Sequence, residues 1–290
     1  MKLLGDTIMQ KKFGYLGGCL VLIIAIIVGV GLRQRSAHQA TPATAHRPVT
    51  QTNHVKTTHV ATTKPWIKLK RPLQLPILMY HSISSGNNLR VPKQQFVQEL
   101  TYLKQHHYRT LTAAEAIRAL KTNTIPQKKV VWLTLDDAYK DNTKIMATLK
   151  KDHFHATINV ITGFTHKTNH LSLAQLKQMK ATGLVDFGSH TVHHLDLNAL
   201  TTAQQRTEII SSKSWLDQHL HQTTTLLCYP AGRANAVTHK LAKQAGYQLA
   251  LTTQEGLASL HEGRYNLSRL RITPGISTAT FATLINVHHS

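Results

Sequence analysis

The stretch Val130-Val131-Trp132-Leu133-Thr134-Leu135 is followed immediately by Asp136-Asp137. Six consecutive apolar or β-branched residues are typical of a buried β-strand. Neighbouring residues of a strand point to opposite faces, but the chain can turn where the strand ends and bring both carboxylates into one pocket. Because Asp-Asp pairs also occur at the starts of helices, this pair does not by itself identify a site.

Further strand-like and helix-like segments alternate along the chain. The strand-like runs cover residues 75–80, 157–161, 184–187, 225–229 and 247–251, and the helix-like segments cover 92–106, 139–152, 172–181 and 201–221. Thr201-Thr202 provides an N-cap for the last of these helices. This alternation predicts a parallel β/α sheet or barrel. In such folds, chemistry gathers at the carboxyl ends of the strands.

An uncharged apolar segment lies near the N-terminus, at residues 13–32, with basic residues on both sides. At about 1.5 Å rise per residue, a helix of this length spans a bilayer core of roughly 30 Å. A cleaved signal peptide is the alternative, but its apolar region is usually about 7–15 residues long and is followed closely by a small-x-small site. The nearest such site here is at residues 43–45. We therefore expect a cytoplasmic tail (1–12) and a transmembrane signal anchor (13–32) in the cell membrane, with the rest of the chain on the extracellular side.

Residues 33–72 are rich in Thr, Ala, Gln, His and basic residues and lack apolar periodicity, which predicts a flexible linker before a domain at 73–290. The formal net charge is +21, and residues 1–72 contain 11 basic residues and one acidic residue. A basic linker would attract anionic wall polymers or lipid headgroups, although a merely solvated spacer explains it equally well. With 6% aromatic residues and no nucleic-acid-binding motif, we expect no nucleic-acid partner.

A second polar cluster, Gly188-Ser189-His190-Thr191-Val192-His193-His194, follows the predicted strand at 184–187. On a helical turn, His190 and His194 would lie on one side, a spacing that suits one metal ion. With 20 His residues in the chain, such pairs also arise by chance. Cys19 and Cys228 form neither a disulfide framework nor a zinc-ribbon pattern, so a metal must be held by His, Asp or Glu. Two His and one Asp with open positions form a known catalytic metal set.

A third cluster, Tyr229-Pro230-Ala231-Gly232-Arg233, closes another predicted strand, where Pro and Gly also suit a simple turn. In this order, Thr134–Tyr139, Gly188–His194 and Tyr229–Gly232 resemble the motifs of the polysaccharide deacetylases, carbohydrate esterase family 4. The resemblance covers about residues 74–273. It includes Pro76–Ile83, which looks like the start of the branch that contains poly-N-acetylglucosamine deacetylases and Gram-positive surface deacetylases.

This resemblance implies an α/β fold, a distorted (β/α) barrel, that removes acetyl groups from N-acetylglucosamine units with one divalent metal ion, often zinc. It implies these roles: Asp137, His190 and His194 as metal ligands, Asp136 as general base, His81 as general acid, and Tyr229 and Ala231 as substrate-binding residues, with the Ala231 N–H stabilising the oxyanion. Such a site combines a Lewis acid with general base catalysis. The implied partner is an extracellular or cell-wall polysaccharide containing N-acetylglucosamine. The alternative is a catalytically impaired glycan-binding surface protein of the same fold.

The sequence departs from the family pattern at three places. Ala138 replaces the usual Gly after the two Asp residues, so a positive φ there would cost energy. Cys228 replaces the Arg that orients the base in many members, and Arg269 is the candidate substitute. The late Leu-x-His that often supplies the acid is absent. His81 is therefore assigned by resemblance to the Tyr-His of the branch, while a satisfied polar residue at a strand end explains it equally well.

Overall fold

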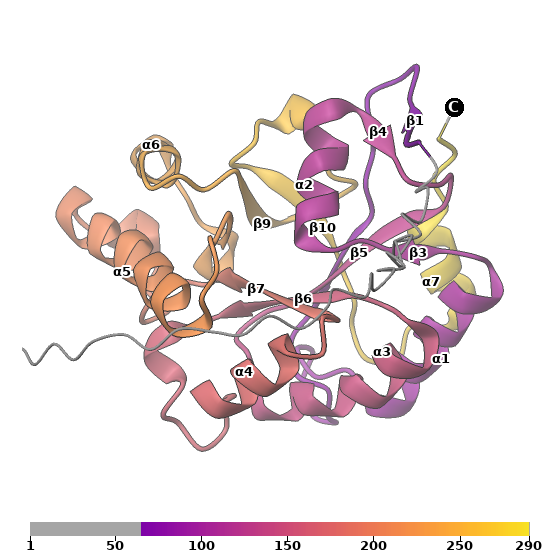
Figure 1. Ribbon diagram of the computed structural model, residues 1–290, viewed down its shortest axis with the longest axis horizontal. Helices are drawn as coiled ribbons and strands as arrows, with labels where there is room; N and C mark the ends of the chain where they lie inside the picture. The colour runs from indigo at the N-terminus through magenta and orange to yellow at the C-terminus, as the bar shows by residue number, and fades with distance from the viewer. Residues whose placement is uncertain (1–64, 290) are drawn as a thin grey trace, which may run out of the picture. The chain divides into compact units, whose positions relative to one another are not determined.

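Seven parallel strands close into a barrel in the computed structural model, which describes residues 65–289 (Figure 1). The ring order is β2-β10-β9-β8-β7-β6-β5, and pairing of β2 with β5 closes it. The strands are β2 (Ile77–Tyr80), β5 (Val130–Leu135), β6 (Ala156–Val160), β7 (Val185–Ser189), β8 (Leu226–Cys228), β9 (Leu249–Glu255) and β10 (Leu267–Arg271). Three two-residue strands lie outside the ring: β1 (Ile67–Lys68), β3 (Arg109–Thr110) and β4 (Thr124–Ile125). The predicted barrel is confirmed.

Helices connect the strands and cover the outside of the barrel (Figure 1). They are α1 (Lys93–Gln105), α2 (Ala113–Thr122), α3 (Met146–Asp152), α4 (Leu173–Lys180), α5 (Thr202–Leu220), α6 (Ala236–Gln244) and α7 (Thr278–Ile285). The predicted N-cap of α5 is confirmed, because the Thr201 side chain accepts the N–H of Gln204 in a capping box. The segment 139–152, predicted as one helix, instead divides into a 3₁₀ helix, η1 (Lys140–Ile145), followed by α3.

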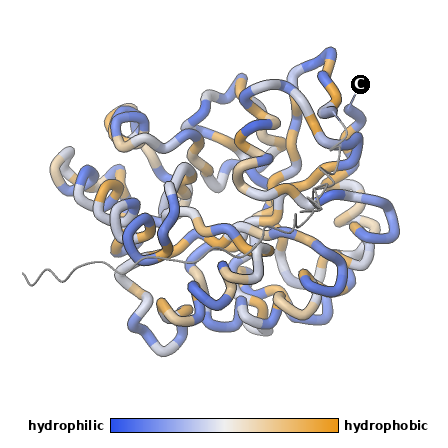
Figure 2. Tube along the Cα trace, viewed as in Figure 1, coloured by the Kyte–Doolittle hydropathy of each residue, from blue (hydrophilic) through white to orange (hydrophobic). Residues whose placement is uncertain are grey.

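Strand alternation produces two apolar layers even though β5 is buried along its whole length. Val131, Leu133 and Leu135 pack in the layer that contains helix residues such as Phe96 and Leu149. Trp132 belongs to the second layer, with barrel residues including Ile77, Leu226 and Leu251. Figure 2 shows the strands as the most continuous hydrophobic part of the trace.

The barrel interior also contains buried polar groups. The indole N–H of Trp132 donates to Thr157 Oγ1 at 2.8 Å, and Thr134, Asn159 and Arg269 are fully buried. Buried polar groups are costly unless they are paired. Their gathering near the strand ends therefore indicates a functional region.

The folded domain begins before residue 73, its predicted start. β1, in the range predicted as linker, pairs antiparallel with β4, and the Leu69 N–H donates to the Asn123 carbonyl at 3.1 Å. The predicted anchor (13–32) and linker residues 33–64 lie outside the described residues. Between residues 65 and 289, no helix is long and apolar enough to cross a membrane.

Candidate metal and catalytic site

Asp137, His190 and His194 lie together at the carboxyl ends of β5 and β7. Asp137 Oδ1 is 3.4 Å from His190 Nε2 and 3.5 Å from His194 Nε2. One potential ligand atom from each residue lies within 4.8 Å of the other two. The structure therefore brings together the three residues that were predicted as metal ligands.

Strand pairing fixes the orientation of His190. Ser189 of β7 lies opposite Leu227 of β8, which places His190 beside Cys228. His190 Nδ1 is 2.8 Å from the Cys228 carbonyl oxygen. Because that oxygen can only accept, Nδ1 carries a hydrogen, which leaves Nε2, the nitrogen that faces Asp137, as the atom available to a cation.

The donor chemistry of this cluster fits a divalent cation. Two imidazole nitrogens and one carboxylate are a common catalytic set for zinc and leave coordination positions open. Asp136, His190 and Cys228 form a second close group. In that group, however, the Asp136 carboxylate is already held by Arg269 and Asn159. The Asp137 group is therefore the better cation site.

The loops that carry these ligands adopt strained backbone conformations. Asp137, Ala138, Thr191 and His194 have φ values of 72°, 56°, 64° and 58°. Such values are uncommon for residues other than glycine, and strain of this kind concentrates at functional sites. At Ala138 the expected cost of replacing glycine is therefore present.

The helical turn predicted between His190 and His194 is wrong, although the two rings do lie on one side, with centroids 4.8 Å apart. The left-handed Thr191 interrupts the segment, and its Oγ1 accepts the His194 N–H at 3.2 Å. The histidines therefore meet through a side-chain-supported loop.

Asp136 is buried inside the barrel end and clamped by Arg269. The guanidinium donates to Asp136 Oδ1 at 2.9 Å and to Oδ2 at 2.7 Å. Asn159 Nδ2 also donates to Oδ1, at 2.8 Å. Arg269 is fully buried and is further held by the Thr252 carbonyl and Thr134 Oγ1. The structure thus places an arginine from β10 against the predicted base.

This clamp controls the charge of Asp136. Burial opposes ionisation of the carboxyl, but the Arg269 guanidinium and its hydrogen bonds outweigh burial and hold the pKa of Asp136 well below its usual range. Asp136 therefore remains a carboxylate across the neutral range, which is the form that a proton acceptor requires.

His81 follows β2 and lies beside Asp136, because β2 pairs with β5 in the register that sets Tyr80 opposite Leu135. His81 Nε2 is 3.9 Å from Asp136 Oδ2, and the side chain is 12% exposed. Among residues 65–289, no partner forms a hydrogen bond with its ring. This arrangement disfavours the reading of His81 as a satisfied structural residue. Burial lowers the pKa of His81, although Asp136 and Asp137 act in the opposite direction.

The Tyr229 side chain does not face the site, contrary to its predicted substrate-binding role. Cys228 points into the barrel, so strand alternation turns Tyr229 outward. Tyr229 is fully buried in an outer cluster with Leu197 and Ile209, and its hydroxyl has no hydrogen-bond partner within the described domain. This residue can therefore not contact a substrate through its ring.

Ala231 lies exposed in the turn after β8, with φ 50° and ψ 17°. Its N–H donates to no backbone or side-chain acceptor in the part of the chain that the structure describes. The Thr253 hydroxyl donates to its carbonyl oxygen at 3.1 Å, which helps to fix the turn. A Cβ on the next residue, Gly232, would lie 2.3 Å from the Thr253 backbone nitrogen, so this close approach requires glycine.

Two supporting residues were missed by sequence reasoning. Glu208 of α5 is buried, accepts the N–H groups of Val192 and His193 at 2.9 Å each, and lies 2.7 Å from His193 Nδ1. It therefore fastens the loop between the two metal-ligand histidines. In the sequence, nothing distinguishes Glu208 from a solvent-exposed glutamate on a helix. Asn159 had a usable signal, because an amide within a strand-like apolar run needs a buried partner.

Comparison with known proteins identifies clear relatives. The family model described as Polysaccharide deacetylase matches residues 123–250, which include Asp136, Asp137, His190 and His194. YxkH of Bacillus subtilis, whose name places it among polysaccharide deacetylases, is 44% identical over 77% of this chain and 80% of its own length. The poly-β-1,6-N-acetyl-D-glucosamine N-deacetylase of Staphylococcus epidermidis is 32% identical over 76% of this chain and 79% of its own.

Solved structures agree with these relationships. The Streptococcus pyogenes deacetylase PplD, solved in complex with acetate, is 40% identical and superposes with a TM-score of 0.72. The match covers 75% of this chain and 100% of that structure. A polysaccharide deacetylase from Bacillus cereus, BC0361, is 27% identical with a TM-score of 0.67, over 74% of this chain and 70% of its own.

Proposed function

The chain belongs to the polysaccharide deacetylase family and is a hydrolase, and we propose that it removes acetyl groups from N-acetylglucosamine units of an extracellular or cell-wall polysaccharide. One observation supports this most directly. The Asp137, His190 and His194 cluster lies immediately beside a carboxylate, Asp136, that is held ionised by Arg269. A cation site next to a fixed proton acceptor is the arrangement that hydrolysis of an acetamide requires.

Asp137 Oδ1, His190 Nε2 and His194 Nε2 are the atoms that would hold the divalent cation, for which we propose zinc. When bound, the cation supplies Lewis-acid polarisation of the acetyl carbonyl and lowers the pKa of the attacking water. His190 is pre-oriented for this task by the Cys228 carbonyl, and Glu208 holds the loop that carries His194. Little conformational entropy is therefore lost when these ligands bind the cation.

Asp136 accepts the proton of the attacking water. The Arg269 clamp makes this carboxylate a weak base, so Asp136 contributes to catalysis mainly through its constant charge and its fixed position. The exposed N–H of Ala231 is the proposed donor to the oxyanion that develops on the acetyl oxygen.

The leaving amine needs a proton before the C–N bond breaks. His81 is the proposed donor, since its Nε2 is 3.9 Å from Asp136 Oδ2 and its ring is partly exposed. The proton that Asp136 gains can pass through His81 to the amine nitrogen. The burial that lowers the pKa of His81 is compatible with this route, because a weakly basic imidazole gives up its proton readily.

We also propose that residues 13–32 anchor the enzyme in the cell membrane with the domain outside. The support is the 20-residue uncharged stretch with basic flanks. Its basic linker would hold the domain near anionic wall polymers. Each deacetylation exposes an amine that is protonated at neutral pH, so the product polymer becomes more cationic.

Acetate release tests the proposed activity. The purified full-length chain is assayed on acetylated chitooligosaccharide, poly-N-acetylglucosamine and peptidoglycan, together with Asp136→Asn. We expect acetate from at least one polymer with the wild type and a loss of about 100-fold or more with the variant. Polymer binding in both proteins without acetate release, under any divalent metal, would instead identify a glycan-binding protein.

A further inference from the structure

A cationic cavity adjoins the catalytic site on the side of Tyr139. It has a volume of about 380 Å³, and its lining includes Arg90, Lys140 and Lys144 together with Tyr139 and Asp141. Tyr139 comes two residues after Asp137, and its hydroxyl lies beside that carboxylate. Burial and, to a smaller extent, this carboxylate raise the pKa of Tyr139 to about 12. One side chain therefore separates the cavity from the predicted metal ligands.

The cavity has more positive than negative charge. Arg90, Lys140 and Lys144 face one carboxylate, Asp141, and none of the ion pairs between residues 65 and 289 involves the three cations. The hydrogen bonds of Asp141 go to other groups: Oδ1 accepts the Ile83 N–H at 2.9 Å and Oδ2 accepts the Ser82 hydroxyl at 2.6 Å. The cavity therefore presents an excess of cations.

The backbone that carries Arg90 is held in place before any ligand binds. The Val91 N–H donates to the Ser82 carbonyl and the Ser82 N–H donates to the Leu89 carbonyl, so the loop is closed on both sides of Arg90. The Arg90 stem crosses Gly86, where a Cβ would lie 2.6 Å from its Cδ. Gly86 has φ 146°, so both the space and the conformation favour glycine here. A fixed backbone reduces the conformational freedom that Arg90 loses when it binds an anion.

We propose that this cavity binds an anionic group, a carboxylate or a phosphate, carried by the polysaccharide next to the acetylated sugar. The proposal rests on the proposed function and deepens it, because it requires a substrate with negative charge close to the N-acetylglucosamine unit. Arginine and lysine together favour such groups. An uncharged homopolymer would leave the three cations without an anionic partner on the substrate.

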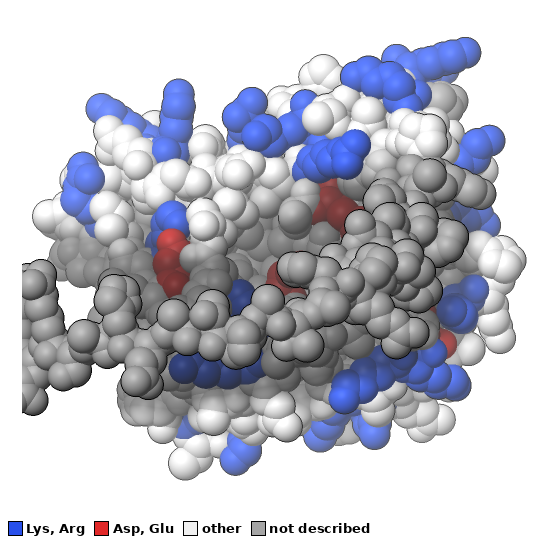
Figure 3. Space-filling view, viewed as in Figure 1, with Lys and Arg blue, Asp and Glu red and all other residues white. Residues whose placement is uncertain are grey.

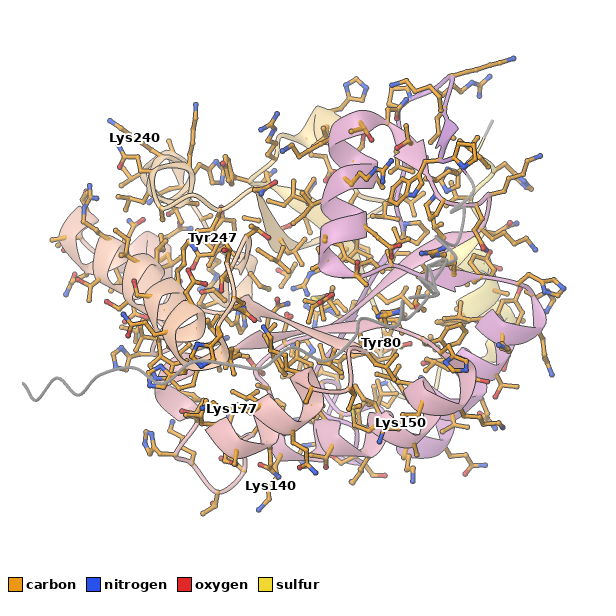
Figure 4. All side chains as sticks on the ribbon, viewed as in Figure 1. Tyr80, Lys140, Lys150, Lys177, Lys240 and Tyr247 are labelled. Atoms are coloured by element: carbon orange, nitrogen blue, oxygen red, sulfur yellow. The ribbon has the colours of Figure 1, made fainter. Side chains whose placement is uncertain are left out.

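The test compares charged and neutral versions of one substrate on the full-length chain. Peptidoglycan glycan fragments with free carboxylates are compared with the same fragments after methyl esterification, and a phosphate-bearing N-acetylglucosamine polymer is compared with its dephosphorylated form. The variants are Arg90→Gln/Lys144→Gln and, as a matched control, Lys240→Gln on α6. Lys240 is exposed, and Figure 4 shows it well separated from Lys140.

We expect the wild type to prefer one charged substrate over its neutral form by roughly 10-fold in kcat/KM, and the double variant to reduce that ratio to about 2 or less. The arm with the larger ratio identifies carboxylate or phosphate as the source. Lys240→Gln should keep the wild-type ratio. A wild-type ratio near 1 in both arms, or an unchanged ratio in the double variant, would overturn the proposal.

The proposed function can fail separately. If no substrate releases acetate, calorimetric binding of the same charged and neutral fragments takes the place of kcat/KM. The cavity proposal then still predicts tighter binding of a charged fragment, lost in the double variant and kept in Lys240→Gln. Equal binding of charged and neutral fragments would overturn it.

Discussion

Replacing Arg269 with Met should expose how strongly the barrel depends on the clamp around Asp136. The substitution keeps an unbranched side chain about as long as the aliphatic stem of arginine, but it removes the guanidinium donors to Asp136 Oδ1 and Oδ2, at 2.9 and 2.7 Å. Both residues are almost fully buried, Arg269 at 0% and Asp136 at 2% exposure. Breaking a buried pair by removal of one partner typically costs about 3–5 kcal/mol, so we expect a loss of that size in the free energy of unfolding at pH 7.

The sign of the pH dependence gives a second readout. In the wild type the pKa of folded Asp136 is lowered, so its contribution to stability is present above the unfolded pKa and is lost as pH falls through the folded pKa. Without Arg269, burial raises the pKa of Asp136 above its unfolded value. This group then makes the protein less stable as pH rises through and above about 4.

Urea denaturation of both proteins between pH 4 and 8 measures these effects. Asp136→Asn in the Arg269→Met background is the control, because it removes the unpaired charge. We expect it to recover about 2 kcal/mol or more at pH 7. A loss below about 1 kcal/mol in Arg269→Met, with no recovery in the double variant, would refute this reasoning.

Four further predictions concern other parts of the domain. Burial raises the pKa of Glu99 to about 7, although hydrogen bonds from Gln95 and Tyr80 act in the opposite direction. The free energy of unfolding of the wild type should therefore fall by up to about 3 kcal/mol as the pH rises from 4.5 through 7. Glu99→Gln should remove this pH dependence, which urea titrations at pH 5.5 and 8.5 measure. Glu208→Gln should weaken zinc affinity roughly 10-fold in competition titrations, because it weakens the hydrogen bonds that hold the loop between His190 and His194. An unchanged zinc affinity would show that Glu208 does not support the metal site. Ala138→Gly should raise the free energy of unfolding by about 0.5–1 kcal/mol, since glycine tolerates the φ of 56°, and a loss of stability would contradict the strain assignment. Tyr229→Phe should leave kcat/KM within about 2-fold, and a larger change would assign the Tyr229 hydroxyl a role in catalysis or substrate binding.

The alternating pattern predicted much of the barrel because apolar runs such as 130–135 reflect burial on both faces. β10 was missed as a strand because Ser268, Arg269 and Arg271 make it look like a polar surface segment. Arg269 is instead buried and paired with Asp136, a contact between residues 133 positions apart. Local sequence patterns carry no information about such a partner.

The site residues divide in the same way. The grouping of Asp137, His190 and His194 was predictable because motif spacing and strand ends bring these residues together, even though the turn between His190 and His194 is not helical. The role of Tyr229 was not, since the choice between facing inward and outward depends on the register of β8. Likewise, the cavity beside Tyr139 combines Lys140 and Lys144 of η1 with Arg90, which is distant in sequence.

The proposed hydrolysis requires Asp137, His190 and His194 to hold one catalytic divalent cation. A stoichiometric metal titration of the chelated full-length chain tests this requirement, with acetate release and bound zinc measured on the same samples, for the wild type and His190→Ala. We predict that activity returns in proportion to zinc up to one equivalent and that the variant neither binds zinc tightly nor releases acetate. Full activity after chelation, or in a variant free of metal, would exclude a catalytic cation at these three residues.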